Sequence, residues 1–128
     1  MNRLTSIVIL AGAALLVVVS AYAAPAVPIM KDMSLASARA GLVKQGWKAR
    51  KIQRFVPSAA MDAFRNAGYA ETEQCGGNEY FCVLDYVNAR GSCLRVIVDY
   101  SYLSPLKAWV SSWTFECPNP EALVKPSG

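Results

Sequence analysis

The chain contains 128 residues with a formal net charge of +4, four cysteines and no histidine. Without histidine it cannot carry a Ser-His or Cys-His catalytic pair, and it lacks a common side-chain ligand for zinc. Its apolar fraction of 54% is raised by the N-terminal segment, so the composition of the whole chain does not indicate a membrane protein.

The N-terminus has the organisation of an export signal. Arg3 supplies a positive charge, and Ile7 to Val19 form an uninterrupted stretch of apolar and small residues. Ala21 and Ala23 provide the small side chains that signal peptidase needs just before its cleavage site. The mature chain is therefore expected to begin at Ala24.

Removal of residues 1–23 as a signal peptide leaves residues 24–128, a length typical of one domain with a modest core. No cysteine follows the apolar stretch, so the lipid-attachment site of a bacterial lipoprotein is absent. The alternative is a retained anchor, because Leu4 to Val27 is just long enough to span about 30 Å of hydrocarbon as a helix. With a cleaved signal the product has no stable membrane anchor, and we expect it in the periplasm or outside the cell.

Charge is distributed unevenly along the mature chain. Residues 24–65 carry eight basic and two acidic side chains, whereas residues 66–128 carry four basic and seven acidic ones. The mature net charge is thus twelve minus nine, or +3. We expect a basic half and an acidic half in the fold.

Two segments have helical spacing and capping residues. Ser34 is a suitable N-cap for a helix from Leu35 to Gln45, and Gly46 follows where a left-handed residue often ends a helix. Ser58 can cap a second helix from Ala59 to Ala67. The predicted buried residues of the two helices are Leu35, Ala38, Leu42, Met61 and Phe64.

The second half of the chain changes to a period of two, with aromatic and β-branched residues in three runs. These predicted strands are Tyr80 to Val87, Cys93 to Leu103 and Ala108 to Cys117. Segments of turn composition, Asn88 to Ser92 and Ser104 to Lys107, separate them. An antiparallel meander is the simplest topology.

The strand register follows from keeping charge out of the core. If Tyr86 lies opposite Leu94, then Asp85 lies opposite Arg95 on the outer face, whereas a slip by one residue would place Asp85 among apolar side chains. The predicted core face carries Tyr80, Cys82, Leu84, Tyr86, Leu94, Val96, Val98 and Tyr100, with Trp109, Trp113 and Phe115 from the third strand. The fold class is therefore α+β, with one or two helices packed on an antiparallel meander of at least three strands.

The cysteines are expected to form two disulfides. Cys75 and Cys82 flank a short segment that contains two glycines, so a local bridge is natural. A Cys82–Cys117 bridge would have to cross two inter-strand spacings, about 9.6 Å, which exceeds disulfide geometry. The predicted bridges are thus Cys75–Cys82 and Cys93–Cys117, and the second requires a bulge or frayed end near one of its cysteines.

Candidate catalytic groups are sparse. Of the carboxylates that could form a glycosidase pair, Asp85, Asp99 and Glu116 are expected on the outer face with Arg95, as solvated charges, and Glu79 completes the set. The sequence contains no phosphate-binding glycine motif and no calcium loop. We expect no enzymatic activity, no cofactor and no metal.

A basic segment is the first candidate binding surface, in a stretch from Trp47 to Val56 that is expected to be extended. Outside the cytoplasm its targets would be anionic lipids, cell-wall polymers or an acidic protein face, and not nucleic acid. The alternative is a solvated face that aids solubility. The residues concerned are Lys44, Trp47, Lys48, Arg50, Lys51 and Arg54.

The predicted turn between the second and third strands is the second candidate. Apolar side chains occupy this turn, and exposed apolar tips often mark partner contacts. The alternative is that the tip folds under and completes the core. The residues are Leu103, Pro105, Leu106 and Trp109.

Two resemblances add to this interpretation. The start of the mature chain resembles the opening βα unit of PASTA domains, through Val27-Pro28, Met33-Ser34, Ala38, Leu42 and Gly46-Trp47. Asp32 stands where that family usually has glycine, and the resemblance implies peptidoglycan binding. The overall architecture, helices followed by a disulfide-associated antiparallel sheet, is similar to the β-lactamase inhibitor protein repeat and related small envelope domains, and this similarity concerns the fold.

The combined hypothesis is an exported, non-enzymatic binding module that binds a protein partner, as a periplasmic inhibitor or an immunity protein does for an envelope enzyme or toxin. A cell-wall binding module and a structural accessory of an envelope assembly are the alternatives.

We predict that the exported protein begins at Ala24, because small residues stand at both signal peptidase positions. Intact-mass measurement of protein recovered from periplasm or medium checks this. Recovery only in the membrane pellet, with residues 1–23 retained, would favour the anchor.

Overall fold

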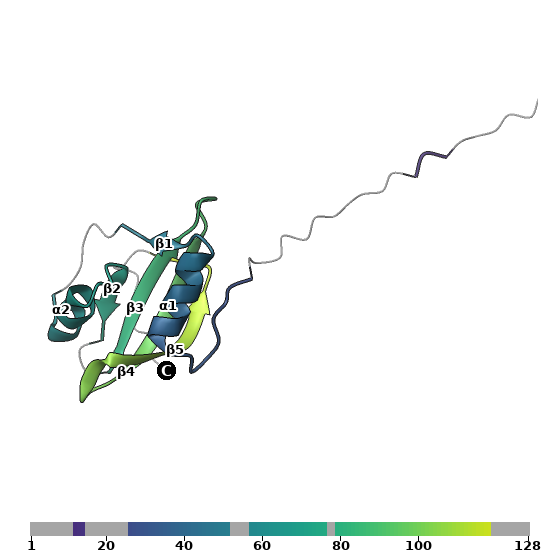
Figure 1. The fold of residues 1–128 in the computed structure, drawn as a ribbon. Coiled ribbons are helices and arrows are strands. Elements are labelled where there is room, and N and C mark those ends of the chain that lie inside the picture. The colour runs from purple at the N-terminus through teal and green to yellow at the C-terminus, as the bar shows by residue number, and fades with distance from the viewer. Residues whose placement is uncertain (1–11, 15–25, 52–56, 77–78, 119–128) are drawn as a thin grey trace, which may run out of the picture.

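The computed structural model of the protein describes residues 12–14, 26–51, 57–76 and 79–118. In this part of the chain two helices pack against an antiparallel sheet, so the predicted α+β class is confirmed (Figure 1). No helix of the described residues is long and apolar enough to cross a membrane. The elements are α1 (Leu35–Lys44), β1 (Lys48–Ala49), α2 (Ala59–Asn66), β2 (Thr72–Cys75), β3 (Phe81–Val87), β4 (Cys93–Ser101) and β5 (Ser104–Thr114).

Both helices begin and end where their capping residues place them. The Ser34 hydroxyl accepts a hydrogen bond from the Ser37 amide at 3.2 Å, and the Ser58 hydroxyl accepts one from the Met61 amide at 3.1 Å. Each predicted helix extended one residue too far at its C-terminus, because Gln45 and Ala67 are C-caps and not helical residues. The caps satisfy amides that would otherwise lack partners in the first turn.

The end of α1 explains the position of Trp47. Gly46 adopts φ +90°, and the Trp47 amide donates to the Leu42 carbonyl at 3.0 Å. This six-to-one bond characterises a Schellman motif, in which the residue after the glycine usually makes an apolar contact with the last helical turn. Trp47 is accordingly buried in the core, alongside Leu42.

The sheet has the order β1-β3-β4-β5, and β2 also pairs with β3. The predicted register between β3 and β4 is confirmed, with Tyr86 opposite Leu94 and Asp85 opposite Arg95. β1 lies in the stretch from Trp47 to Val56 that was expected to be extended, whereas β2 was not predicted. Both pair with the other edge of β3. β3 is therefore enclosed on both edges.

A bulge in β5 corrects one prediction about the core. Ser112 lies opposite Ile97, but Val110 lies opposite Val98, so Ser111 is the extra residue. The alternation therefore shifts by one, and Trp109 lies opposite Asp99 on the outer face instead of in the core. Among the described side chains of this strand, Ala108 and Val110 are buried, whereas Trp113, also predicted in the core, is 37% exposed. Phe115 is partly buried against the core.

Both predicted disulfides are present. The Cα atoms of Cys75 and Cys82 are 4.0 Å apart, and those of Cys93 and Cys117 are 6.1 Å apart. β5 ends at Thr114, three residues before the second bridge, and this provides the frayed end that the pairing requires. No described cysteine is free.

The free edge of β5 is partly covered by the chain that precedes α1. The Asp32 amide donates to the Val110 carbonyl at 2.7 Å, and the Val110 amide donates to the Met33 carbonyl at 2.8 Å. Asp32 has φ +67°, a left-handed conformation that glycine adopts most easily. This turn directs the chain from the edge of the sheet into α1.

The burial of a side chain of α2 in the core allows a test of how this helix packs on the sheet. Phe64 of α2 is fully buried, and replacing it by alanine should reduce the free energy of unfolding by about 3–5 kcal/mol. Urea unfolding measures the change. Val43→Ala, at a residue of α1 that is 58% exposed, should change stability by less than about 0.5 kcal/mol. Equal effects of the two substitutions would contradict this packing.

Candidate functional site

Exposed apolar side chains concentrate at the hairpin between β4 and β5. The turn lies at Tyr102 and Leu103, and the prediction of a turn at Ser104 to Lys107 was wrong, because β5 already begins at Ser104. We define residues 102–107, the turn and the start of β5, as the hairpin tip. Tyr102, Leu103 and Leu106 are 66%, 78% and 58% exposed, and neighbouring Tyr80 is 54% exposed. The tip does not fold under to complete the core. The side chain of Pro105 lies outside the described part of the structure.

Aromatic rings connect the tip to the core. The ring of buried Phe64 lies 5.7 Å from that of Tyr100, which lies 5.7 Å from that of Tyr80. Tyr80 in turn lies 5.6 Å from Tyr102. Tilted and edge-on ring pairs at these separations are favourable. The series of contacts therefore supports Tyr102 in an exposed position without burying it.

The tip is almost uncharged. From Tyr100 to Phe115 the sequence contains no acidic residue and a single cation, Lys107, which is exposed. Trp109 follows on the outer face of β5 and is 37% exposed. The tip thus presents large apolar side chains with little competing charge.

The structure separates the residues of the predicted basic segment. Lys44, Lys48 and Lys51 are exposed, whereas Trp47 is buried and cannot form part of a binding surface. Arg50 Nη1 lies 3.3 Å from the Asp85 carboxylate, so its charge is paired. Arg54 lies outside the described residues.

The outer face of the sheet carries a buried ion cluster. Arg95 Nε and Nη2 donate to both carboxylate oxygens of Asp85 at 2.8 and 2.7 Å, and Nη2 also donates to Glu73 at 3.1 Å. The side chains of Arg95 and Asp85 are 3% and 0% exposed. The prediction that these two residues are solvated was therefore wrong, although Glu116 is exposed and Asp99 is half-buried.

A bulge in β2 and the chain after β5 cover this cluster. The register between β3 and β4 alone does not reveal either of them. Glu73 is the bulged residue between Thr72 and Gln74 of β2, where the pairing with β3 shifts. The chain after β5 contributes backbone carbonyls, from Cys117 to Arg50 at 3.4 Å and from Pro118 to Arg95 at 3.0 Å. The Cys93–Cys117 bridge holds this chain on β4 beside the cluster.

A second buried network lies on the core side. Arg39 of α1 pairs with the Glu71 carboxylate at 2.7 Å, and the Tyr86 hydroxyl donates to the same carboxylate at 3.0 Å. Burial, and then the adjacent negative charge of Glu71, raise the pKa of Tyr86 far above its usual range. Tyr86 therefore remains a hydrogen-bond donor at any physiological pH.

These networks pair the buried carboxylates of the described chain. Glu71, Glu73 and Asp85 each bind an arginine. Among residues 26–51, 57–76 and 79–118, no group of three or more His, Cys, Asp or Glu side chains is placed to hold a metal ion. Because these carboxylates are buried and paired with arginines, their role is structural. The candidate binding sites are therefore the exposed ends of the domain.

Sequence reasoning found Leu103 and Leu106 and missed Tyr102, and its placement of Tyr80 on the core face was wrong, because Tyr80 is 54% exposed. Both tyrosines lie at ends of predicted strands, Tyr80 as a first residue and Tyr102 as a second-last one, but their rings meet only after β3 and β4 pair. No protein-family model, no curated protein and no solved structure matches the chain. The PASTA and inhibitor-like resemblances therefore stay predictions.

We predict that the free energy of unfolding depends strongly on the negative charge of Asp85 in the buried ion cluster. Asp85→Asn keeps the shape of the side chain but, among the described residues, leaves Arg95 with Glu73 as its only carboxylate and Arg50 with none, and it should lower the free energy of unfolding by about 3 kcal/mol or more. Asp99→Asn, on the neighbouring strand, is the matched control and should have little effect. Equal midpoints in urea for the two variants would contradict the structural role of the cluster.

Proposed function

We propose that this chain is an exported, non-enzymatic binding domain whose hairpin tip is inserted into a protein partner. In this proposal the domain acts as an inhibitor, or as an immunity protein for an envelope-targeted toxin. The observation that carries the proposal is that Tyr80, Tyr102, Leu103 and Leu106 are each more than half exposed at one end of the domain. A concentration of large apolar side chains in water favours an interaction surface.

The chemistry of the tip supports a protein as the partner. Tyrosine combines a large apolar area with a polar hydroxyl and is enriched in protein interfaces, as are other aromatic residues. Leu103 is the most exposed of these side chains at 78%, so it suits the role of central anchor in a partner's pocket. A protruding hairpin fits a concave cleft better than a flat surface.

The rigidity of the tip also supports recognition. Contacts from Phe64 through Tyr100 and Tyr80 to Tyr102 hold the aromatic side chains before any partner is met. A surface that is already ordered loses less conformational entropy on binding. The two disulfides fit an exported protein and add to this order.

Leu103→Asp should weaken binding to the partner by about thirty-fold or more, because a central apolar anchor contributes about 2 kcal/mol or more. Exported wild-type and variant proteins are immobilised, periplasmic extract is applied, and the retained proteins are compared. The affinity of the retained partner is then measured for each variant.

Val43→Asp is the matched control, since Val43 is also an apolar residue with a largely exposed side chain, but it lies in α1 outside the tip. It should leave binding unchanged, and both variants should keep the unfolding midpoint of the wild type. A partner retained equally by both variants, or the absence of any stoichiometric partner, would overturn the proposal.

A further inference from the structure

Four exposed cations gather at one end of the domain, and we call this group the cationic end. Lys44 lies in the last turn of α1, Lys48 in β1, Lys51 just after it, and Arg90 in the turn between β3 and β4. Lys48 lies opposite Val87, the last residue of β3, which places β1 beside that turn. Arg90 was not part of the basic segment identified from sequence.

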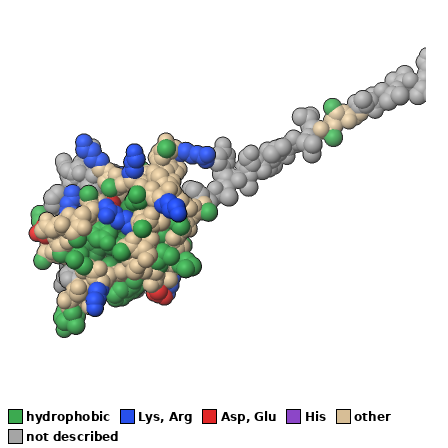
Figure 2. Space-filling view, in the orientation of Figure 1, with side chains coloured by type: hydrophobic (Ala, Val, Ile, Leu, Met, Phe, Trp, Pro, Cys, Tyr) green, Lys and Arg blue, Asp and Glu red, His purple; other side chains and the backbone are tan. Residues whose placement is uncertain are grey.

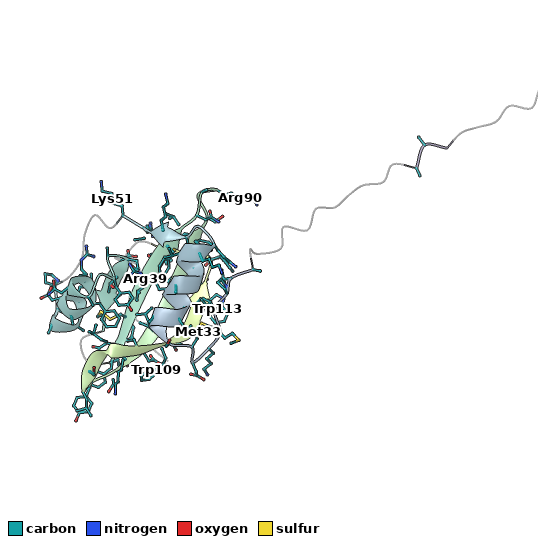
Figure 3. All side chains as sticks on the ribbon, in the orientation of Figure 1. Met33, Arg39, Lys51, Arg90, Trp109 and Trp113 are labelled. Carbon is teal, nitrogen blue, oxygen red and sulfur yellow. A yellow bond between two sulfur atoms is a disulfide. The ribbon has the colours of Figure 1, made fainter. Side chains whose placement is uncertain are left out.

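The cationic end lies opposite the hairpin tip. Lys51 and Arg90 are at one end of the sheet, and Trp109, which follows the tip, is at the other (Figure 3). Blue side chains line the upper margin of the domain, and a green projection marks the lower one (Figure 2). The two candidate surfaces therefore face in opposite directions.

The four cations are not neutralised by the described part of the fold. None of them forms a salt bridge with a described residue. The nearby carboxylate of Asp85 is buried and is already bound by Arg50 and Arg95. Positive charge at this end is consequently available to an external anion.

The N-terminal segment of the chain enters the domain near the cationic end. Pro28 packs against α1 beside Gly41, since a Cβ atom built on that glycine would lie 3.1 Å from Pro28 Cγ. Gly41 precedes Lys44 by one turn. The expected cleavage site after Ala23 is five residues before Pro28, a reach of at most about 18 Å. The described chain before α1 therefore passes beside the part of this helix that leads to Lys44.

We propose that the cationic end docks on the anionic phospholipid surface from which the exported chain emerges, so that the hairpin tip points away from the membrane. Lysine and arginine near an anionic membrane are attracted to it over about one Debye length, roughly 10 Å at 0.1 M salt. Val43, an exposed apolar residue beside Lys44, would lie at the same interface. This inference goes beyond the proposed function and does not depend on a protein partner.

Binding to vesicles tests the proposal. The exported protein is sedimented with vesicles of phosphatidylcholine and phosphatidylglycerol, and with vesicles of phosphatidylcholine alone, at low and high salt. We expect binding only to the anionic vesicles and only at low salt. A retained apolar segment would bind both kinds of vesicle. The additional binding to anionic vesicles over neutral ones therefore measures the contribution of the cationic end, whether or not that segment is retained.

Two double variants with the same net charge locate the interaction. Lys48→Gln with Lys51→Gln should reduce partitioning by roughly ten- to thirty-fold, which corresponds to about 1 kcal/mol for each cation. Lys31→Gln with Lys107→Gln removes two exposed cations from elsewhere and should leave partitioning nearly unchanged. Equal losses for the two pairs would show that net charge alone attracts the protein, and would overturn the docking.

Acylation of lysines on the wild-type protein gives the orientation without any substitution. With anionic vesicles, Lys44, Lys48 and Lys51 should be protected from an amine-reactive reagent, while Lys107 at the tip stays reactive. Protection of Lys107 instead would show that the tip enters the bilayer. Sedimentation with isolated peptidoglycan, but not with vesicles, would assign the cations to the cell wall. Either result overturns the proposal, and neither requires the tip's protein partner to be known.

Discussion

The ion pair between Asp85 and Arg95 is the contact on which the outer face of this fold depends. It joins β3 to β4 through two short hydrogen bonds, and it recruits Glu73 from β2 and Arg50 from the segment after β1. Charges this deeply buried are tolerated only when each has partners. Five separate parts of the chain, including the carbonyls after β5, are thereby fixed to one another.

This pairing also decides which charges remain for function. Arg39 and Arg50 come from the basic half of the sequence, and Glu71 and Asp85 from the acidic half, so the halves neutralise each other inside the domain. Three exposed lysines of the basic half, Lys44, Lys48 and Lys51, are left at the cationic end. The aromatic contacts that begin at Phe64 meanwhile leave the opposite end apolar. A domain with one cationic and one apolar end results.

Much of the fold could be predicted because local rules determined it. Caps at Ser34 and Ser58 set the helices, and excluding Asp85 from the core set the register of β3 and β4. Burial of Trp47 was also predictable in principle, since an apolar residue after a helix-ending glycine indicates a Schellman contact. The bulge at Ser111 and the burial of Arg95 were not, because each depends on how distant segments pack.

The central claim, that the hairpin tip is the surface that meets a protein partner, is tested most directly by site-specific photocrosslinking in intact cells. A photoreactive side chain is placed at Leu103 in one version of the exported protein and at Arg90 in another. The account predicts one discrete protein adduct from position 103 and none from position 90. A protein adduct from position 90 with none from position 103 would contradict it.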